Sequence, residues 1–193
     1  MIENKIYKLI EKIYNYPRSL TGMGNLKTLK VFKRILPEIK IIKEKSGKNI
    51  NGWIVPDEWN FKGAYIKDSN GKKILDTNNS NLHVVNFSKP IKKKINLKNL
   101  KKKIHSISTY PNAIPYVTSY YNKDWGFCME DSKKKKLKKD IYDINIDTEF
   151  KKGFLYYGEI VIKGKSNKEV LISSYICHPS MANNELSGPC LSL

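Results

Sequence analysis

Cysteine is scarce in this sequence, and the few cysteines present form no motif. The chain has three, Cys128, Cys177 and Cys190, an odd number without a CxxC pair. This argues against a disulfide framework and against a cysteine-rich zinc knuckle. Each cysteine is therefore predicted to be a small buried hydrophobe or a free thiol.

Long apolar runs are absent as well. No run approaches the roughly 20 residues needed to span a bilayer, and Met1–Lys5 mixes charges where a signal peptide has an unbroken apolar stretch. Hydrophobic residues nevertheless make up 40% of the chain and aromatic residues 11%, so a packed core is possible and disorder is not indicated. We expect a cytoplasmic protein with no membrane partner.

Arginine is the third scarce residue, although the formal net charge is +18. Such a charge is usual for proteins that bind nucleic acid or anionic membranes. Here the excess is nearly all lysine, whereas phosphate-reading surfaces favour the bidentate fork of arginine. The lysine runs at 92–94, 101–103 and 133–136 lack the interleaved aromatic residues of a strand-binding surface. A solvated lysine-rich surface is the preferred interpretation, and nucleic acid is not the expected partner.

The apolar spacing that is present predicts an α/β fold. Helical periodicity covers residues 3–15 and continues in a second helix from Leu26 to Leu36. Short strand patterns follow from residue 39 to residue 87, including two runs around Asn70-Gly71 that predict a β-hairpin. In the last third, Glu169–Cys177 is predicted to be a central strand buried on both faces.

These patterns predict a small antiparallel β module after the second helix, and an α/β core whose sheet is formed by the last third of the chain. The sequence ends at Leu193 just as a helix begins. The core is therefore expected to be incomplete, with a missing C-terminal half or a homo-oligomeric partner covering its sheet.

The segment most suggestive of chemistry follows the predicted central strand. His178 comes directly after it, and Asn184 and Glu185 follow six and seven residues later. Sites collect at the carboxyl ends of strands in open α/β sheets, and imidazole with a carboxylate is half of a metal site. A lone histidine at a strand end is also often a hydrogen-bonded structural residue. A Cys177–His178 nucleophile–base pair is disfavoured, because adjacent residues of a strand point to opposite faces.

A collinear series of segments resembles a bacterial group of M28-like zinc aminopeptidases, which carry a DUF2172 insert and a C-terminal winged-helix domain called DUF4910. The similarity covers almost the whole chain. The segments that carry it are Pro17–Asn25, Gly52–Trp59, Asn81–Val85, Ile114–Tyr121, Trp125–Cys128 and Ile172–Pro189.

The resemblance implies that residues 1–37 and 132–193 form an α/β core in which helices flank a mixed sheet, and that residues 38–131 form an inserted, small β-rich module. It also implies a zinc-dependent hydrolase that cleaves a peptide or amide bond next to a free amino group. It implies that His178 is the first zinc ligand, that Asn184 stands at the position of a metal-bridging aspartate, and that Glu185 is an alternative oxygen ligand. Ser180 stands where the family has an acidic residue that orients the histidine ring. The general base and the remaining ligands are expected beyond residue 193.

A second hypothesis concerns the β-rich insert. Trp53, Trp59 and Trp125 are either packing residues, which is the commoner role of buried aromatics, or stacking platforms for sugars. The alternative function is thus a catalytically silent module that binds carbohydrate or protein, and the departures at Ser180 and Asn184 favour it.

Overall fold

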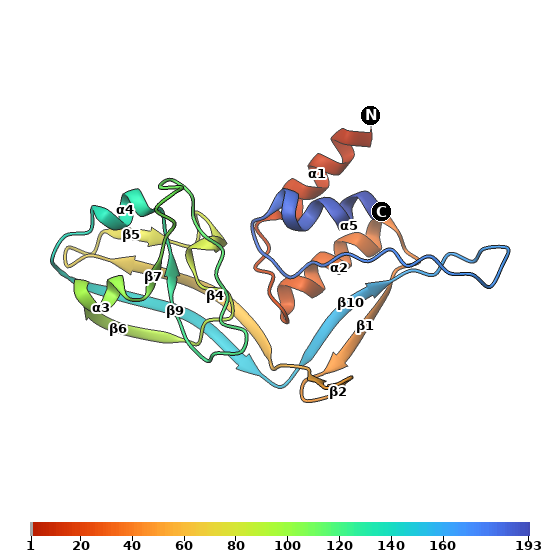
Figure 1. Cartoon of the computed structure of the whole chain (residues 1–193), viewed down its shortest axis with the longest axis horizontal. Coiled ribbons are helices and arrows are strands. Elements are labelled where there is room, and N and C mark those ends of the chain that lie inside the picture. The colour runs from red at the N-terminus through yellow and green to blue at the C-terminus, as the bar shows by residue number, and fades with distance from the viewer. Residues whose placement is uncertain (1) are drawn as a thin grey trace. The chain divides into compact units, whose positions relative to one another are not determined.

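The computed structural model describes residues 2–193, which fall into two compact units (Figure 1). The first unit is the chain up to Glu58 together with Lys151–Leu193, and the second is Trp59–Phe150. The predicted α/β class with an inserted β-rich module is confirmed. The divisions lie near residues 58 and 150 rather than at 38 and 131. The first differs because strand β1 (Lys40–Lys45) pairs with strand β10 (Phe154–Glu159) of the first unit, and the second because strand β9 (Ile141–Lys151) pairs with strand β6 (Ile91–Asn96) of the second.

The helices of the first unit follow their apolar periodicity, as predicted. Ile13 is fully buried on the first helix, and Leu29 and Phe32 are buried on the second. No helix in the described part of the chain is long and apolar enough to cross a membrane. The elements of this unit are α1 (Ile2–Tyr14), α2 (Met23–Ile35), β1, β2 (Asn49–Ile50), β3 (Trp53–Ile54), β10, the π-helix η2 (Ala182–Leu186) and α5 (Ser187–Ser192).

A single apolar cluster holds this unit together. β1 and β10 form an antiparallel pair with Ile42 opposite Tyr157, and helix α2 contacts β10. The C-terminal elements η2 and α5 contact α1, and they contribute Leu186 and Cys190 to the same cluster as Ile13 and Phe32. The end of the described chain is thus packed against its beginning.

The predicted central strand at Glu169–Cys177 is wrong. Within residues 2–193, no helix or strand is assigned from Ile160 to Met181. Val170 and Leu171 are each 90% exposed, and Ile172 is 78% exposed. An apolar run becomes a buried strand only when neighbouring strands satisfy its backbone groups and other elements cover its faces. The run itself supplies neither, although Ile176 packs on the apolar cluster.

The second unit is built on a four-stranded sheet. Its strand order is β5-β4-β9-β6, and a two-stranded parallel pair, β7 and β8, lies outside that sheet. The elements are β4 (Glu58–Lys67), β5 (Lys73–Asp76), the 3-10 helix η1 (Asn81–His83), β6 (Ile91–Asn96), α3 (Leu97–Lys101), β7 (Ile104–His105), β8 (Phe127–Cys128), α4 (Asp131–Lys135) and β9 (Ile141–Lys151).

The hairpin around Asn70-Gly71 is confirmed. β4 and β5 are antiparallel, with Ile66 opposite Leu75. The carboxylate of Asp68 accepts backbone hydrogen bonds from Asn70 and Lys72, at 3.0 and 2.9 Å. Gly71 has a φ of +81°, a left-handed conformation that glycine adopts at no steric cost.

The last of the strand patterns predicted between residues 39 and 87, at Leu82–Phe87, is wrong. The side chain of Ser80 accepts the N–H of Leu82 at 3.2 Å, and this cap starts the short helix η1 instead. The chain then makes only isolated bridges, Val84 with Phe127 and Asn86 with Thr118. Local side-chain capping thus outweighed the β propensity of this apolar segment.

Candidate metal site

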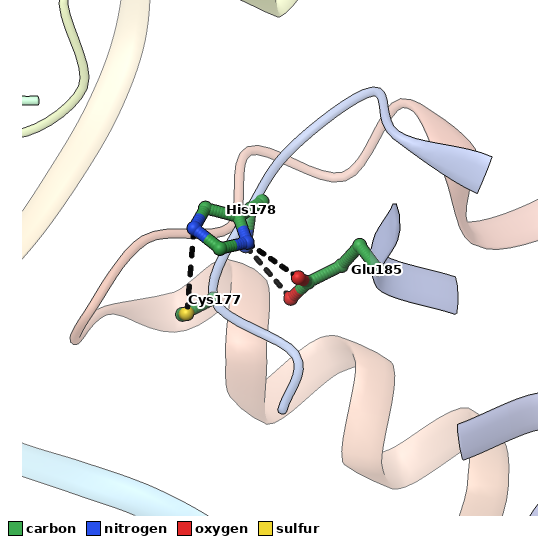
Figure 2. Close-up of side chains that lie close together, drawn as sticks. All are labelled: Cys177, His178 and Glu185. Carbon is green, nitrogen blue, oxygen red and sulfur yellow. Dashed lines mark hydrogen bonds and ion pairs between the residues drawn. The ribbon is translucent and has the colours of Figure 1, made fainter. Parts of the chain in front are cut away.

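The imidazole of His178 is held by the carboxylate of Glu185 (Figure 2). The backbone N–H of His178 donates to Oε1 of Glu185 at 2.8 Å, and the ring Nδ1 lies 2.5 Å from Oε2. Glu185 comes from the π-helix η2 and is 1% exposed. The carboxylate therefore fixes both the ring and the backbone of His178, and Nδ1 is the ring nitrogen it engages.

The other ring nitrogen faces a cysteine. Nε2 of His178 lies 4.0 Å from Sγ of Cys177. The expectation that Cys177 and His178 point to opposite faces is wrong, because residues 177 and 178 are not in a strand and their side chains need not alternate. Cys177, His178 and Glu185 each offer a ligand atom, and these atoms lie within 4.8 Å of one another.

The buried side chain of Arg18 holds the backbone at His178 in place. This side chain is fully buried, with Nε donating to the carbonyl of His178 at 3.1 Å and a terminal nitrogen donating to the carbonyl of Ile13 at 2.5 Å. Burial lowers the pKa of its guanidinium to about 10, and the charge of Glu185 opposes that shift. A second tie joins the same elements, since the N–H of Ser180 donates to the carbonyl of Tyr14 at 3.1 Å.

The turn that carries Arg18 is closed by its own side chains. Asn25 accepts the N–H of Ser19 at 3.1 Å and donates to its carbonyl at 2.7 Å. Gly24 allows the helix to approach this turn, because a Cβ added there would lie 2.2 Å from the carbonyl oxygen of Pro17. The turn-rich segment at 17–25 was visible in the sequence, but its role in supporting His178 was not.

Gly24→Ala is expected to lower the free energy of unfolding by about 1–3 kcal/mol, as overpacking against rigid backbone does. The direction of this change in stability is informative, since replacing glycine with alanine inside a helix ordinarily stabilises a protein by about 1 kcal/mol. Gly164→Ala is the control, because a Cβ there would meet nothing within 4 Å. Chemical denaturation of the three proteins measures the effect, and a Gly24→Ala variant as stable as the parent would contradict the close approach.

The imidazole of His178 is protonated at neutral pH. Hydrogen bonds to Cys177 and Glu185 raise the pKa of His178 to about 9, and burial acts in the opposite direction. The imidazolium at neutral pH balances the buried Glu185 carboxylate, so His178, Glu185 and Arg18 form one electrostatic unit.

The structure brings together two of the three predicted ligands. His178 and Glu185 are in contact, whereas Asn184 lies in the same π-helix with its residue exposed. Ser180 is 4% exposed with a φ of +51°. The resemblance implied that an acidic residue at position 180 orients the histidine ring. In this chain Glu185 makes that contact with the ring of His178. Cys177 is the potential donor that sequence reasoning set aside.

The donor set fits part of a zinc site. Imidazole, thiolate and carboxylate are the usual zinc ligands. Tetrahedral bond lengths place neighbouring nitrogen and sulfur ligands about 3.6 Å apart, close to the 4.0 Å between Nε2 of His178 and Sγ of Cys177. A carboxylate on the second ring nitrogen is the common way in which proteins orient a zinc-bound histidine. Catalytic zinc usually has three protein ligands, so this cluster makes up only part of a coordination shell.

Comparison with known proteins shows what the two units are similar to. Residues 58–149, almost the whole second unit, match the family described as "Domain of unknown function (DUF2172)". A curated protein of Clostridium acetobutylicum is 42% identical over 187 residues and is named "Putative polysaccharide biosynthesis protein with aminopeptidase-like domain". A crystal structure described as a "putative peptidase" from the same organism matches with a TM-score of 0.94 at 41% identity.

The matches cover nearly all of this chain but not all of its relatives. They span 97% of the chain, 43% of the curated protein and 44% of the crystallised chain. The crystallised protein therefore contains a region with the fold of nearly this whole chain, and that region includes both units.

Proposed function

We propose that this chain forms the N-terminal part of an M28-like zinc aminopeptidase. The observation that carries the proposal is the geometry at His178, whose Nδ1 is held by Glu185 at 2.5 Å while Nε2 faces a second potential donor. The names of the relatives support it, since one is called a peptidase and the other is said to have an aminopeptidase-like domain. The proposal also includes a cytoplasmic location and a DUF4910 winged-helix domain in the complete protein.

The proposed reaction is hydrolysis of a peptide or amide bond next to a free amino group. Zinc, when bound, lowers the pKa of a coordinated water and polarises a carbonyl oxygen. Within this chain, Nε2 of His178 is the proposed ligand, with Cys177, Asn184 or Glu185 as further candidates. Glu185 fixes the orientation of the ring, and Arg18 fixes its backbone. The general base is proposed to lie in the region of the relatives that this chain does not span.

The proposed substrate is a peptide or an amino-linked conjugate. The name of the curated relative combines an aminopeptidase-like domain with polysaccharide biosynthesis. Amino-linked sugar conjugates are therefore tested as substrates beside peptides. Model substrates are aminoacyl p-nitroanilides with a free amino group, together with their N-acetylated counterparts. An enzyme of the proposed class cleaves the free forms much faster than the acetylated forms.

The metal is tested by elemental analysis of two proteins after loading with zinc and dialysis. One is this chain, and the other is a fusion of these 193 residues to the part of the Clostridium relative that the alignment does not cover. We expect stoichiometric zinc in the fusion, loss of zinc on His178→Gln, and retention on His105→Gln, which changes an exposed histidine. Absence of zinc from the fusion, or its retention after His178→Gln, would overturn the proposed site. The remaining interpretation would then be a binding module that uses the second unit.

A further inference from the structure

The second unit contains a pocket that combines clustered lysines with a tryptophan. It has a volume of about 380 Å³ and lies beside β6 and α3. Sites for small molecules usually range from about 300 to 1,000 Å³, so its size suits one small molecule. Its lining includes Lys93, Lys94, Asn99, Lys102, Lys103 and Trp125.

Folding supplies the aromatic residue that the lysine runs lack in sequence. Trp125, which precedes β8, lies with its ring 5.2 Å from Nζ of Lys93 and 5.3 Å from Nζ of Lys103. Trp125 is 7% exposed, and its ring meets Phe127 edge-on at 6.3 Å. The indole is thus a fixed platform, and cation–π attraction holds two ammonium groups over it.

Positive charge exceeds negative charge at this pocket. Asp124 pairs with Lys103, whose Nζ lies 2.7 Å from both carboxylate oxygens. This hydrogen bond lowers the pKa of Asp124, so the carboxylate is ionised at neutral pH. One carboxylate beside four lining lysines leaves an excess of ammonium donors in one concave place.

Protection of a sheet edge does not account for the arrangement. β6 is an edge strand, and Lys93 lies on the same face of it as Ile91 and Ile95, which pack on the core. A charge on the inward face of an edge strand discourages pairing between molecules. That role requires only Lys93, whereas Lys103 and Trp125 come from outside the strand and converge on the same point.

We propose that this pocket binds a small molecule carrying a phosphate or carboxylate group. The lysines supply charge-assisted hydrogen bonds, and the tryptophan holds two of them in place before the ligand arrives. Nucleic acid is the less suitable ligand, because single strands use several aromatics along an extended groove, and here one tryptophan lies in one small pocket. This binding site is separate from the proposed hydrolase chemistry at His178.

The test is calorimetric titration of the whole chain with glucose 6-phosphate, glucuronate and glucose. The three share a hexose frame and differ in the group that carries the charge. We expect saturable binding of at least one anion, with one site per chain, and no binding of glucose. Binding of the phosphate alone identifies phosphate as the recognised group, and binding of glucuronate alone identifies carboxylate.

A charge-matched pair of variants shows where the anion binds. Lys93→Gln/Lys103→Gln should weaken binding at least about tenfold, the effect of losing two charge-assisted hydrogen bonds. Lys67→Gln/Lys72→Gln removes the same charge and also a lysine over an aromatic ring, at 4.6 Å from the centre of Tyr65, and should change affinity less than about twofold. Circular dichroism checks that both variants fold.

Three results would overturn the inference. One is that neither anion binds, and another is that the two double variants weaken binding equally. The third is that a thymidine oligonucleotide binds more tightly than the anions, with a steep salt dependence that both double variants reduce alike. That result would identify a diffuse electrostatic surface for nucleic acid in place of a pocket.

Discussion

Replacing Arg18 with alanine is expected to lower the free energy of unfolding by about 3–5 kcal/mol, because it removes two buried hydrogen bonds from a charged donor, each worth about 1.5–3 kcal/mol. Arg18 is fully buried, and its guanidinium donates to the carbonyls of Ile13 and His178. Its loss removes one donor from each carbonyl, although the N–H of Tyr16 still donates to that of Ile13. It also removes the positive charge near the Glu185 carboxylate, which is 1% exposed.

The chain carries its own control for this experiment. Arg34 is exposed on α2, so Arg34→Ala should change stability by less than about 0.5 kcal/mol. Arg18→Lys keeps the charge but not the planar fork, and should fall between the two. Urea denaturation of the three variants measures the effect. Equal stability of Arg18→Ala and Arg34→Ala would show that Arg18 does not anchor the His178 segment.

Stability should fall as the pH rises from about 6.5 to about 9, by on the order of 3 kcal/mol from His178 alone. The folded pKa of His178, about 9, lies above the ordinary value of 6.5. The imidazolium is therefore stabilised in the folded state, and that contribution is fully present below the unfolded pKa. It is lost as His178 deprotonates in the folded protein. The side chain is 21% exposed, so solvent screens it only in part.

Comparison with variants isolates this contribution from other titrating groups. Free energies of unfolding are measured at pH 6, 7.5 and 9 with chelator present, for the parent, His178→Gln and Glu185→Gln. His178→Gln should flatten the dependence between pH 6.5 and 9, and Glu185→Gln should flatten it in part, because Cys177 also raises the pKa of His178. His105→Gln should keep the dependence. A parent and a His178→Gln variant with parallel profiles would show that the contacts with Cys177 and Glu185 do not stabilise the protonated ring.

Local sequence signals predicted much of the fold. The apolar spacing of residues 3–15 predicted α1, and Asn70-Gly71 predicted the turn between β4 and β5. These features depend on nearby residues alone. Glu169–Cys177 failed as a predicted strand because burial of Leu171 and Ile172 requires partners, which no local pattern can supply.

The candidate site was predictable only in part, for the same reason. The spacing of His178 and Glu185 indicated that they act together, but not that the carboxylate engages Nδ1. Arg18 lies 160 residues from His178 in sequence, so its role depends on tertiary packing. In the second unit, the lysine runs were treated as a solvated surface because no aromatic is close in sequence, and Trp125 reaches them only through the fold.

The most direct test of the proposed metal site is a crystal structure of the zinc-loaded fusion, with anomalous data collected at the zinc edge. The account predicts an anomalous peak about 2.0–2.1 Å from Nε2 of His178, the normal zinc–imidazole distance, with Glu185 still on Nδ1. A zinc peak elsewhere, or none within bonding distance of the His178 ring, would contradict it.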